Sequence, residues 1–256
     1  MAYKAEKILP YQQEEKKSIQ VRRMFDAIAQ DYDRLNHIMT FGGIDKRWRK
    51  TAIRLVGEKN PRRILDVATG TGDLALSIYK TLHPEQIVGI DLSEQMLSIA
   101  RDKSNNAGIS GKITFECQDC LNLSFADASF DAVTVAFGVR NFEDIQRGVN
   151  EMFRVLAPEG VLMVLELSTP DQIPFKQFYR LYARYVIPLL GKIFSKEKMA
   201  YQYLPRSVAA VPQGDVMLQI FRNAGFENTR CKRLTFGSCS VYLGEKQQKE
   251  TGDGKE

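Results

Sequence analysis

The sequence contains no long hydrophobic run. No apolar stretch approaches the ~20 residues that a membrane-spanning helix needs. The first twenty residues mix lysine and glutamate with apolar positions, and they hold no apolar core of the kind found in a secretory signal. Because both features are absent, we expect a cytoplasmic protein that touches a membrane only at its surface.

Cysteine and histidine are also scarce, with four cysteines and two histidines in 256 residues. Cys117 and Cys120 form a C-x-x-C pair, whereas Cys231 and Cys239 lie eight residues apart with no histidine beside them. A structural zinc site would need a second close pair of ligands. A redox pair would open a helix of a thioredoxin-like unit, which the pattern does not show. We therefore expect reduced, partly buried thiols and no metal site.

Short apolar runs alternate with amphipathic stretches from Pro61 onward. This alternation is typical of a parallel sheet with helices on both of its faces. Two further apolar runs follow near the C-terminus with almost no connection between them, so they should pair as an antiparallel hairpin. The expected strands are 62–68, 86–92, 112–118, 130–138, 160–168, 226–237 and 238–246, and the expected intervening helices are 73–82, 93–107 and 141–157.

Five parallel strands closed by a C-terminal antiparallel hairpin are unusual for a dinucleotide-binding domain. The arrangement resembles the seven-stranded, mostly parallel sheet of class I S-adenosylmethionine-dependent methyltransferases, an α/β fold with a helical cap. The chain 1–256 is interpreted as a single such domain. Its expected parts are mobile ends at 1–15 and 246–256, a helical cap and substrate region at 16–60 and 170–212, a cofactor-binding core at 61–168 and a terminal hairpin at 226–245.

The long helical region from Phe175 to about Ala224 contains three prolines. Because proline lacks the backbone N–H that a helix interior uses, we expect breaks at Pro188, Pro205 and Pro212.

The loop GTGD at 70–73 follows the first predicted strand, and together with Ala75 it satisfies the G-x-G-x-x-G/A pattern of a dinucleotide site. In such sites a pyrophosphate binds the free N–H groups at the helix N-terminus. Here Asp73 opens the helix and would compete with a phosphate, and Asp66 adds a second negative charge. Two acids beside the loop favour a cationic ligand without phosphate. S-adenosylmethionine fits, because it carries a sulfonium and an ammonium.

Two more acids extend this predicted site. Asp91 ends the second strand, where an acidic side chain can accept hydrogen bonds from both ribose hydroxyls. Asp119 follows the third strand, where a carboxylate can accept from an adenine amino group. Each residue alone has a structural explanation: Gly72 permits tight packing of strand and helix, and Asp91 can cap the helix that begins at Ser93. The predicted cofactor-binding set is Asp66, Gly70, Thr71, Gly72, Asp91, Asp119 and Cys120.

Nucleic acid is not expected as a partner. The net charge of +5 is mild, and the predicted sheet carries no dense Lys/Arg stripe with interleaved aromatics. The stretch FGVRNF at 137–142 also lacks the proline-containing element that DNA-base amino-methyltransferases carry after the fourth strand.

Longer motifs make the resemblance more specific. These motifs are YDRLNHIMTFGGIDKRW at 32–48, FGVRNF at 137–142, RVLAPEGVLMVLELS at 154–168 and YQYLPRSV at 201–208. They are similar to signatures of the UbiE/MenG family, the C-methyltransferases of ubiquinone and menaquinone biosynthesis, and the similarity runs from about residue 20 to 244. The family signature usually has serine at Thr40 and histidine at Asp45, and some members have a cofactor-touching serine at Ala136. The second signature departs at Ala157 and Glu159.

The resemblance implies methyl transfer from S-adenosylmethionine to a ring carbon of a demethylated prenyl quinol, foremost demethylmenaquinol, with a benzoquinol as the second possibility. Such a site must align the reacting atoms, exclude water, and stabilise or create a phenolate. Arg140, Tyr201 and His37 are the catalytic candidates, and Tyr32 is a further one. Arg140 has an alternative role in an ion pair with Glu143 or Asp144.

The segment 175–194 has two faces that suit a membrane interface. Lys176, Arg180 and Arg184 form a basic stripe, which suggests contact with an anionic surface at the inner face of the cytoplasmic membrane. A cap helix packed on the sheet is the alternative. The aromatic stripe beside the basic one comprises Phe175, Phe178, Tyr182, Tyr185 and Val186.

Three other functions remain open from the sequence. The same fold can methylate another small apolar molecule, such as a phenol, a sterol or a phospholipid amine. A non-catalytic partner that has kept the fold is the second alternative, and a dehydrogenase is the third.

Overall fold

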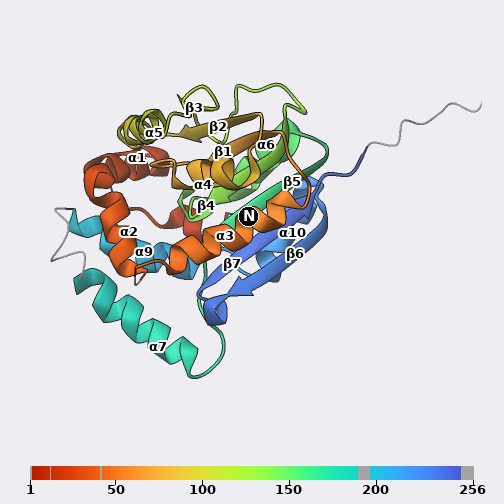
Figure 1. The fold of residues 1–256 in the computed structure, drawn as a ribbon. Coiled ribbons are helices and arrows are strands. Elements are labelled where there is room, and N and C mark those ends of the chain that lie inside the picture. The colour runs from red at the N-terminus through yellow and green to blue at the C-terminus, as the bar shows by residue number, and fades with distance from the viewer. Residues whose placement is uncertain (1, 12, 41, 190–196, 249–256) are drawn as a thin grey trace, which may run out of the picture.

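The computed structural model describes residues 2–11, 13–40, 42–189 and 197–248. Its centre is a seven-stranded sheet with the order β3-β2-β1-β4-β5-β7-β6 (Figure 1). The strands are β1 (Arg63–Val67), β2 (Gln86–Asp91), β3 (Ile113–Cys117), β4 (Phe130–Ala136), β5 (Leu156–Leu167), β6 (Glu227–Leu234) and β7 (Cys239–Glu245).

The first five strands run parallel, and β7 pairs antiparallel with both β5 and β6. The expected fold, with its terminal hairpin, is therefore confirmed. Strand β5 begins four residues earlier than the apolar pattern predicts, because Leu156 already pairs with Phe130 across an irregularity in the register.

Helices cover both faces of the sheet. Successive residues of a strand point to opposite faces, so Ile64 packs with α3 and α4, whereas Leu65 packs with α6 and α10. A third apolar cluster joins α1, α2 and α9 into a cap. The helices named here are α1 (Lys17–Ile28), α2 (Tyr32–Met39), α3 (Ile44–Gly57), α4 (Asp73–Leu82), α5 (Glu94–Asn106), α6 (Ile145–Val155), α7 (Phe175–Leu181), α9 (Lys198–Ala210) and α10 (Asp215–Ala224).

Helix α7 lies at the edge of the molecule, below α2 and α9 in the view of Figure 1. It continues into η4 (Tyr182–Val186), a π-helical turn, and the helical conformation extends through Pro188 to Leu189. The hydroxyl of Tyr182 donates to the carbonyl of Met39 at 2.6 Å and so ties η4 to α2. Within the described residues no helix has the length and apolar character needed to cross a membrane.

Two of the expected helix breaks are wrong. The sequence predicts a break at Pro205, but this residue lies inside α9. The buried residues Tyr203 and Ser207 hold the helix on both sides of it, so packing outweighs the lost hydrogen bond. The helical backbone also continues through Pro188. Pro212 does follow the end of α9, as expected.

The N-terminal residues, which the sequence predicts to be mobile, are docked in the structure. They form η1 (Lys4–Lys7), and Ala5 is fully buried. The buried Lys17 donates through Nζ to the carbonyl oxygens of Ala5 at 2.7 Å, Arg140 at 3.0 Å and Phe142 at 3.1 Å. Lys17 therefore ties η1 to the loop after β4. Most of the other expected mobile end, residues 249–256, lies outside the described residues.

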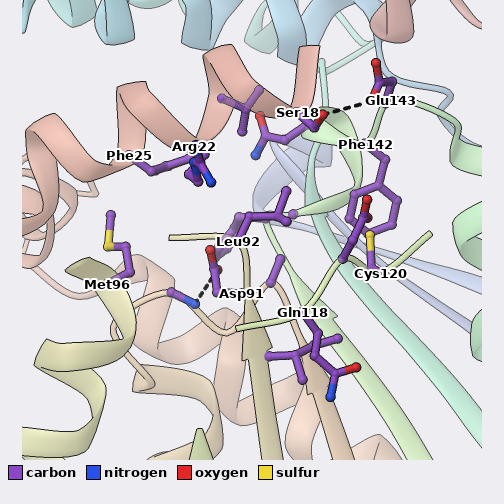
Figure 2. Close-up of a pocket in the computed structure, with 18 of the residues that line it drawn as sticks. Ser18, Arg22, Phe25, Asp91, Leu92, Met96, Gln118, Cys120, Phe142 and Glu143 are labelled. Atoms are coloured by element: carbon purple, nitrogen blue, oxygen red, sulfur yellow. Dashed lines mark hydrogen bonds between the residues drawn. The ribbon is translucent and has the colours of Figure 1, made fainter. Parts of the chain in front are cut away.

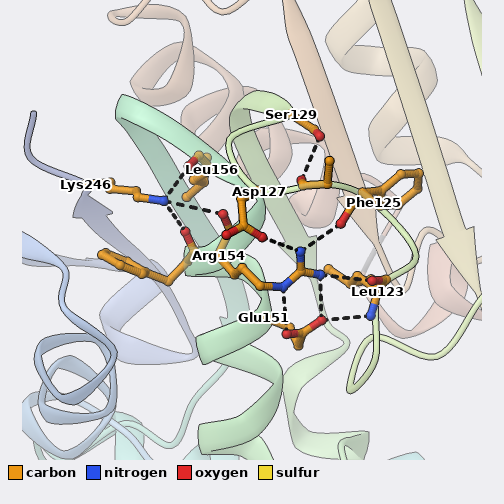
Figure 3. Close-up of polar contacts among 10 residues, drawn as sticks. Leu123, Phe125, Asp127, Ser129, Glu151, Arg154, Leu156 and Lys246 are labelled. Atoms are coloured by element: carbon orange, nitrogen blue, oxygen red, sulfur yellow. Dashed lines mark hydrogen bonds and ion pairs between the residues drawn. The ribbon is translucent and has the colours of Figure 1, made fainter. Parts of the chain in front are cut away.

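Arg154, the first residue of the 154–168 motif, has a structural role and lies far from the glycine loop in sequence. Arg154 donates to the carbonyl oxygens of Leu123 at 2.9 Å and Phe125 at 2.8 Å, and pairs with Glu151 and Asp127 (Figure 3). Hydrogen bonds to these carboxylates raise the pKa of Arg154, so the guanidinium stays charged. These contacts hold the loop between β3 and β4 against α6.

Candidate active site

Glycine shapes the turn that follows β1. Gly70 and Gly72 have φ of +57° and +80°, in the left-handed region that favours glycine. A Cβ on Gly72 would lie 3.0 Å from the Cβ of Ala100 and 3.1 Å from the ring of Phe115, so Gly72 serves close packing. The space beside Gly70 is open within 4 Å. Gly70 is thus the glycine whose missing side chain leaves room for a ligand.

Asp91, at the end of β2, fixes this turn from the neighbouring strand. Its Oδ2 accepts from the N–H of Gly70 and its Oδ1 from the N–H of Ser93, both at 2.9 Å. Burial raises the pKa of Asp91, although these hydrogen bonds oppose the shift. Ser93 caps α5 as predicted, with its Oγ accepting from the N–H of Met96. Asp91 therefore supports the helix start and also faces the cavity described next.

A pocket lies at the carboxyl ends of β1, β2 and β4 (Figure 2). This is where ligands bind in open α/β sheets, beside the point at which the strand order reverses. Figure 2 shows side chains of α1 across the opening from Asp91, Leu92 and Met96. The segments after β3 and β4 supply further polar residues, among them Gln118 and Glu143. Residues lining this first chamber include Ser18, Arg22, Phe25, Asp91, Gln118, Asp119 and Cys120.

A second chamber continues the first along the glycine loop. The two share Tyr32, Ala68, Gly70, Ala136 and Phe137 in their walls. Ala68 and Phe137 follow the adjacent strands β1 and β4, and they have positive φ of +52° and +59° although neither is glycine. Such strained residues gather at functional sites. The second chamber adds Arg49, Asp66, Thr69, Thr71, Asp73 and Leu74.

Asp66 is the buried acid of the second chamber. Its two oxygens accept from the hydroxyls of Thr69 at 2.6 Å and Thr134 at 2.7 Å. Burial raises its pKa to about 6, and the two hydroxyls oppose that shift only in part. Asp66 therefore gains its charge just below neutral pH, and a cation placed beside it would favour the ionised form.

We expect the affinity for S-adenosylmethionine to fall as the pH drops below 6. If the cationic ligand binds the ionised Asp66 as predicted, a proton must first be lost at lower pH, and the apparent Kd should rise about tenfold per pH unit. Above pH 6 this dependence should vanish. Calorimetric titrations between pH 5 and 7 test this, with Asp66→Asn as the control that should bind weakly at every pH. An equally steep dependence in that variant would assign the effect to another group.

A third chamber adjoins the second and is lined mainly by aromatic and apolar side chains. It shares Tyr32, Arg49 and Phe137 with the second chamber. A ring bound here would lie next to whatever occupies the glycine-loop side. The remaining lining residues are Asn36, Met39, Thr40, Asp45, Trp48, Arg140, Leu167, Tyr179, Tyr182, Ile187 and Leu204.

Arg140 is the buried cation of the third chamber. Its Nη1 donates to Glu166 Oε1 at 2.8 Å and also to the carbonyl of Phe137, and its Nε is buried without a hydrogen-bond partner among the described residues. Burial lowers the pKa of Arg140, but the charge of Glu166, the hydrogen bond to it and the nearby Tyr32 and Tyr203 together outweigh burial and raise the pKa. Arg140 therefore stays protonated. The alternative left open by the sequence, an ion pair with Glu143 or Asp144, is not formed, because Arg140 pairs with Glu166 instead.

The other two catalytic candidates lie in different surroundings. Tyr201 is buried and lines a smaller cavity that Tyr32 and Arg140 also line, so the fold brings Tyr201 and Arg140 together. His37 is exposed on α2 and is not among the residues that line these cavities.

Sequence reasoning missed the helix that closes over the glycine loop. Asp33 on α2 accepts from the hydroxyl of Thr71 at 2.7 Å. Lys103 bridges Asp33 at 2.5 Å and Asp73 at 2.7 Å. Asp33 lies within the motif at 32–48, but the motif does not indicate which distant residue this carboxylate contacts.

Residues 12–246 match the model of the ubiE/COQ5 methyltransferase family. A demethylmenaquinone methyltransferase of Bacteroides fragilis is 50% identical over 96% of this chain and 100% of its own length. The corresponding protein of Porphyromonas gingivalis is 46% identical over 94% of this chain and 98% of its own. The ubiquinone/menaquinone biosynthesis C-methyltransferase UbiE of Geobacter sulfurreducens is 42% identical over 95% and 94%.

Solved methyltransferase structures share the fold. Haemonchus contortus phosphoethanolamine N-methyltransferase 2, in complex with S-adenosylhomocysteine, has a TM-score of 0.67 at 14% identity, covering 91% of this chain and 62% of that one. A possible histamine N-methyltransferase of Thermotoga maritima has a TM-score of 0.61 at 17% identity, covering 88% and 99%. At these identities the likeness supports the fold alone.

Proposed function

The chain belongs to the ubiE/COQ5 methyltransferase family, and from this we propose that it transfers a methyl group from S-adenosylmethionine to a ring carbon of a demethylated prenyl quinol, foremost demethylmenaquinol. The observation that carries the proposal is the joined cavity, in which an acid-lined part meets an aromatic part at Tyr32 and Phe137. A cationic donor and an apolar ring can meet there.

The donor is placed by charge. Its adenosine fits the first chamber, where Asp91 accepts from the ribose hydroxyls and Asp119, with Cys120 beside it, faces the base. Its methionine end fits the second chamber beside Asp66, with Gly70, Thr71 and Gly72 forming the loop below it. The sulfonium then lies where the chambers join, next to Phe137. Aromatic rings attract cations across their faces, which suits this position.

The acceptor ring fits the third chamber. When the quinol loses a phenolic proton, its ring carbon attacks the sulfonium methyl. The new carbon–carbon bond forms as the sulfur–methyl bond breaks, the sulfur leaves as neutral S-adenosylhomocysteine, and the ring loses its hydrogen as a proton. We assign stabilisation of the phenolate to Arg140, because it is buried, permanently charged and has an N–H to donate. Tyr201 supports this side of the cavity.

A methyl-transfer assay tests the proposal. Purified protein is given S-adenosylmethionine with a labelled methyl group and, in separate reactions, demethylmenaquinol, a demethylated benzoquinol, a simple phenol, a sterol and phosphatidylethanolamine. We expect label in a product that is heavier by one methyl group from demethylmenaquinol. Turnover confined to the sterol, phenol or phospholipid would replace the quinol assignment, and no turnover with any acceptor would favour a non-catalytic protein.

The segment around α7 supports a second part of the proposal, contact with an anionic membrane surface. Part of its aromatic stripe is used internally: Phe175 stacks on Phe236 with ring centroids 3.8 Å apart, and Tyr182 bonds α2. The other stripe residues, Phe178, Tyr185 and Val186, are exposed. Together with the exposed Leu181 and Leu189 they form an apolar surface. Lys176, Arg180 and Arg184 are exposed beside it. An apolar tail could reach the third chamber, which Tyr179 and Ile187 line from the same segment.

We expect the protein to cosediment with vesicles that contain anionic lipid, and expect added salt to weaken this binding. The double variant Arg180→Glu/Arg184→Glu should reduce the bound fraction severalfold. Lys80→Glu/Lys112→Glu makes the same change of charge at exposed positions outside this segment and serves as the control. Equal losses in both variants, or no binding by the natural protein at low salt, would refute a specific lipid-facing surface.

A further inference from the structure

The second chamber holds both signs of charge. Asp66 is buried on one side of it, and Arg49 of α3 contributes a guanidinium. The methionine tail of the donor is itself a pair of opposite charges, an ammonium and a carboxylate. Resting on the proposed function, we propose that Arg49 binds the carboxylate of this tail while Asp66 binds its ammonium.

The surroundings of Arg49 leave one edge of its guanidinium available. Nη1 donates to Oδ2 of Asp45 at 2.5 Å and lies 4.0 Å from Oδ2 of Asp73. The Nε is buried and has no hydrogen-bond partner among the described residues. Because a buried N–H without an acceptor costs free energy, this donor marks a place for one. A carboxylate accepting from Nε and the adjacent Nη2 would make the bidentate contact that arginine favours.

Other side chains hold Arg49 in this position. Its guanidinium carbon lies 5.7 Å from the ring centroid of Phe137, which the second and third chambers share. Asp45 fixes Nη1 and is itself held by the hydroxyl of Thr40 at 2.9 Å. The family signature usually has serine and histidine where this chain has Thr40 and Asp45. Here the pair orients the arginine, so we assign Asp45 as a positioning residue.

The carboxylate is a better occupant than the acceptor ring. Arg49 also borders the third chamber, but that chamber already has a buried cation with an unused N–H in Arg140. The second chamber has Arg49 as its cationic lining residue, and the tail of the donor brings a negative charge into it. Without Arg49 the only charged side chains lining this chamber would be the two acids Asp66 and Asp73, among the described residues.

The test compares S-adenosylmethionine with its decarboxylated form, which differs only by the carboxylate. Calorimetry on the natural protein should show that S-adenosylmethionine binds about 30- to 100-fold more tightly, the range expected for a buried bidentate ion pair. In Arg49→Met this preference should shrink to about threefold or less, mainly through weaker binding of S-adenosylmethionine. The preference of Arg49→Lys should lie between those of the natural protein and Arg49→Met, because lysine keeps the positive charge but cannot make the bidentate contact.

The matched control is Arg54→Met, an exposed arginine on the same helix, which should keep the preference. Thermal unfolding of each variant reports whether it folds, and the ligand comparison in the natural protein needs no variant at all. Equal binding of both ligands by the natural protein, or an equal loss for both in Arg49→Met, overturns the carboxylate assignment. Failure of the natural protein to bind either ligand overturns the proposed function itself.

Discussion

Replacing Arg140 with methionine should lower kcat for quinol methylation by about 10²- to 10³-fold, the usual cost of removing one donor that stabilises developing negative charge. Arg140 is 6% exposed and remains charged because Glu166 lies 2.8 Å away. A phenolate beside it would be stabilised in surroundings with little water. The KM for S-adenosylmethionine should change little, because Arg140 does not line the two donor chambers.

Loss of Arg140 also leaves Glu166 buried without its counter-ion, which by itself would weaken folding. The double variant Arg140→Met/Glu166→Gln separates the two effects, because it removes the orphaned charge. We expect it to recover much of the thermal stability of the single variant and none of its kcat. Recovery of kcat together with stability would show that Arg140 acts only through the fold.

Replacing Asp91 with alanine should weaken S-adenosylmethionine binding by about 10- to 100-fold, or about 1.4 to 2.8 kcal/mol. Two contributions add in this variant: the proposed hydrogen bonds to the ribose hydroxyls are lost, and the N–H of Gly70 loses the carboxylate that fixes the loop. Calorimetry gives the affinity directly. With saturating donor, kcat should stay near that of the natural protein, because the acceptor chamber is intact.

Asp91→Asn is the matched control for this prediction. Its side chain keeps one oxygen acceptor but not the charge, so the loss of affinity should be smaller than for alanine. Unchanged binding by Asp91→Ala would remove Asp91 from the donor site. Tight binding of NADH by the natural protein, with no binding of S-adenosylmethionine, would show that the glycine loop binds a dinucleotide instead.

The parts of the structure that were predictable are those set by neighbours in sequence. Alternating apolar runs marked the strands, the short connection before Cys239 marked the hairpin, and Ser93 marked a helix start. Each depends on contacts within a few residues. Asp66, Asp91 and Asp119 line neighbouring pockets, as their positions predict, because parallel strands all end at one edge of the sheet. Their role in binding the donor stays a prediction.

The parts that were missed depend on contacts between distant residues. Glu166, the partner of Arg140, lies 26 residues further along the chain, and Asp33 lies 38 residues before Thr71. Lys17 reaches Arg140 across 123 residues. Charge and spacing in the sequence do not indicate which distant residue forms such a pair, and acidic residues nearer in sequence fit the pattern equally well. The predicted helix break at Pro205 is wrong for a related reason, because tertiary packing outweighs the local tendency of proline to end a helix.

Helix α2 contributes residues to both proposed ligand sites, so binding at one site should affect binding at the other. Asp33 of this helix accepts from the hydroxyl of Thr71 in the glycine loop, where we propose that the donor binds. Tyr32, Asn36 and Met39 of the same helix line the chamber proposed for the acceptor ring. A ligand that orders this helix lowers the free-energy cost of ordering it for the other ligand. Thermodynamic linkage requires this effect on affinity to be mutual. Donor and quinol should therefore bind with positive cooperativity, each raising the affinity for the other by the same factor.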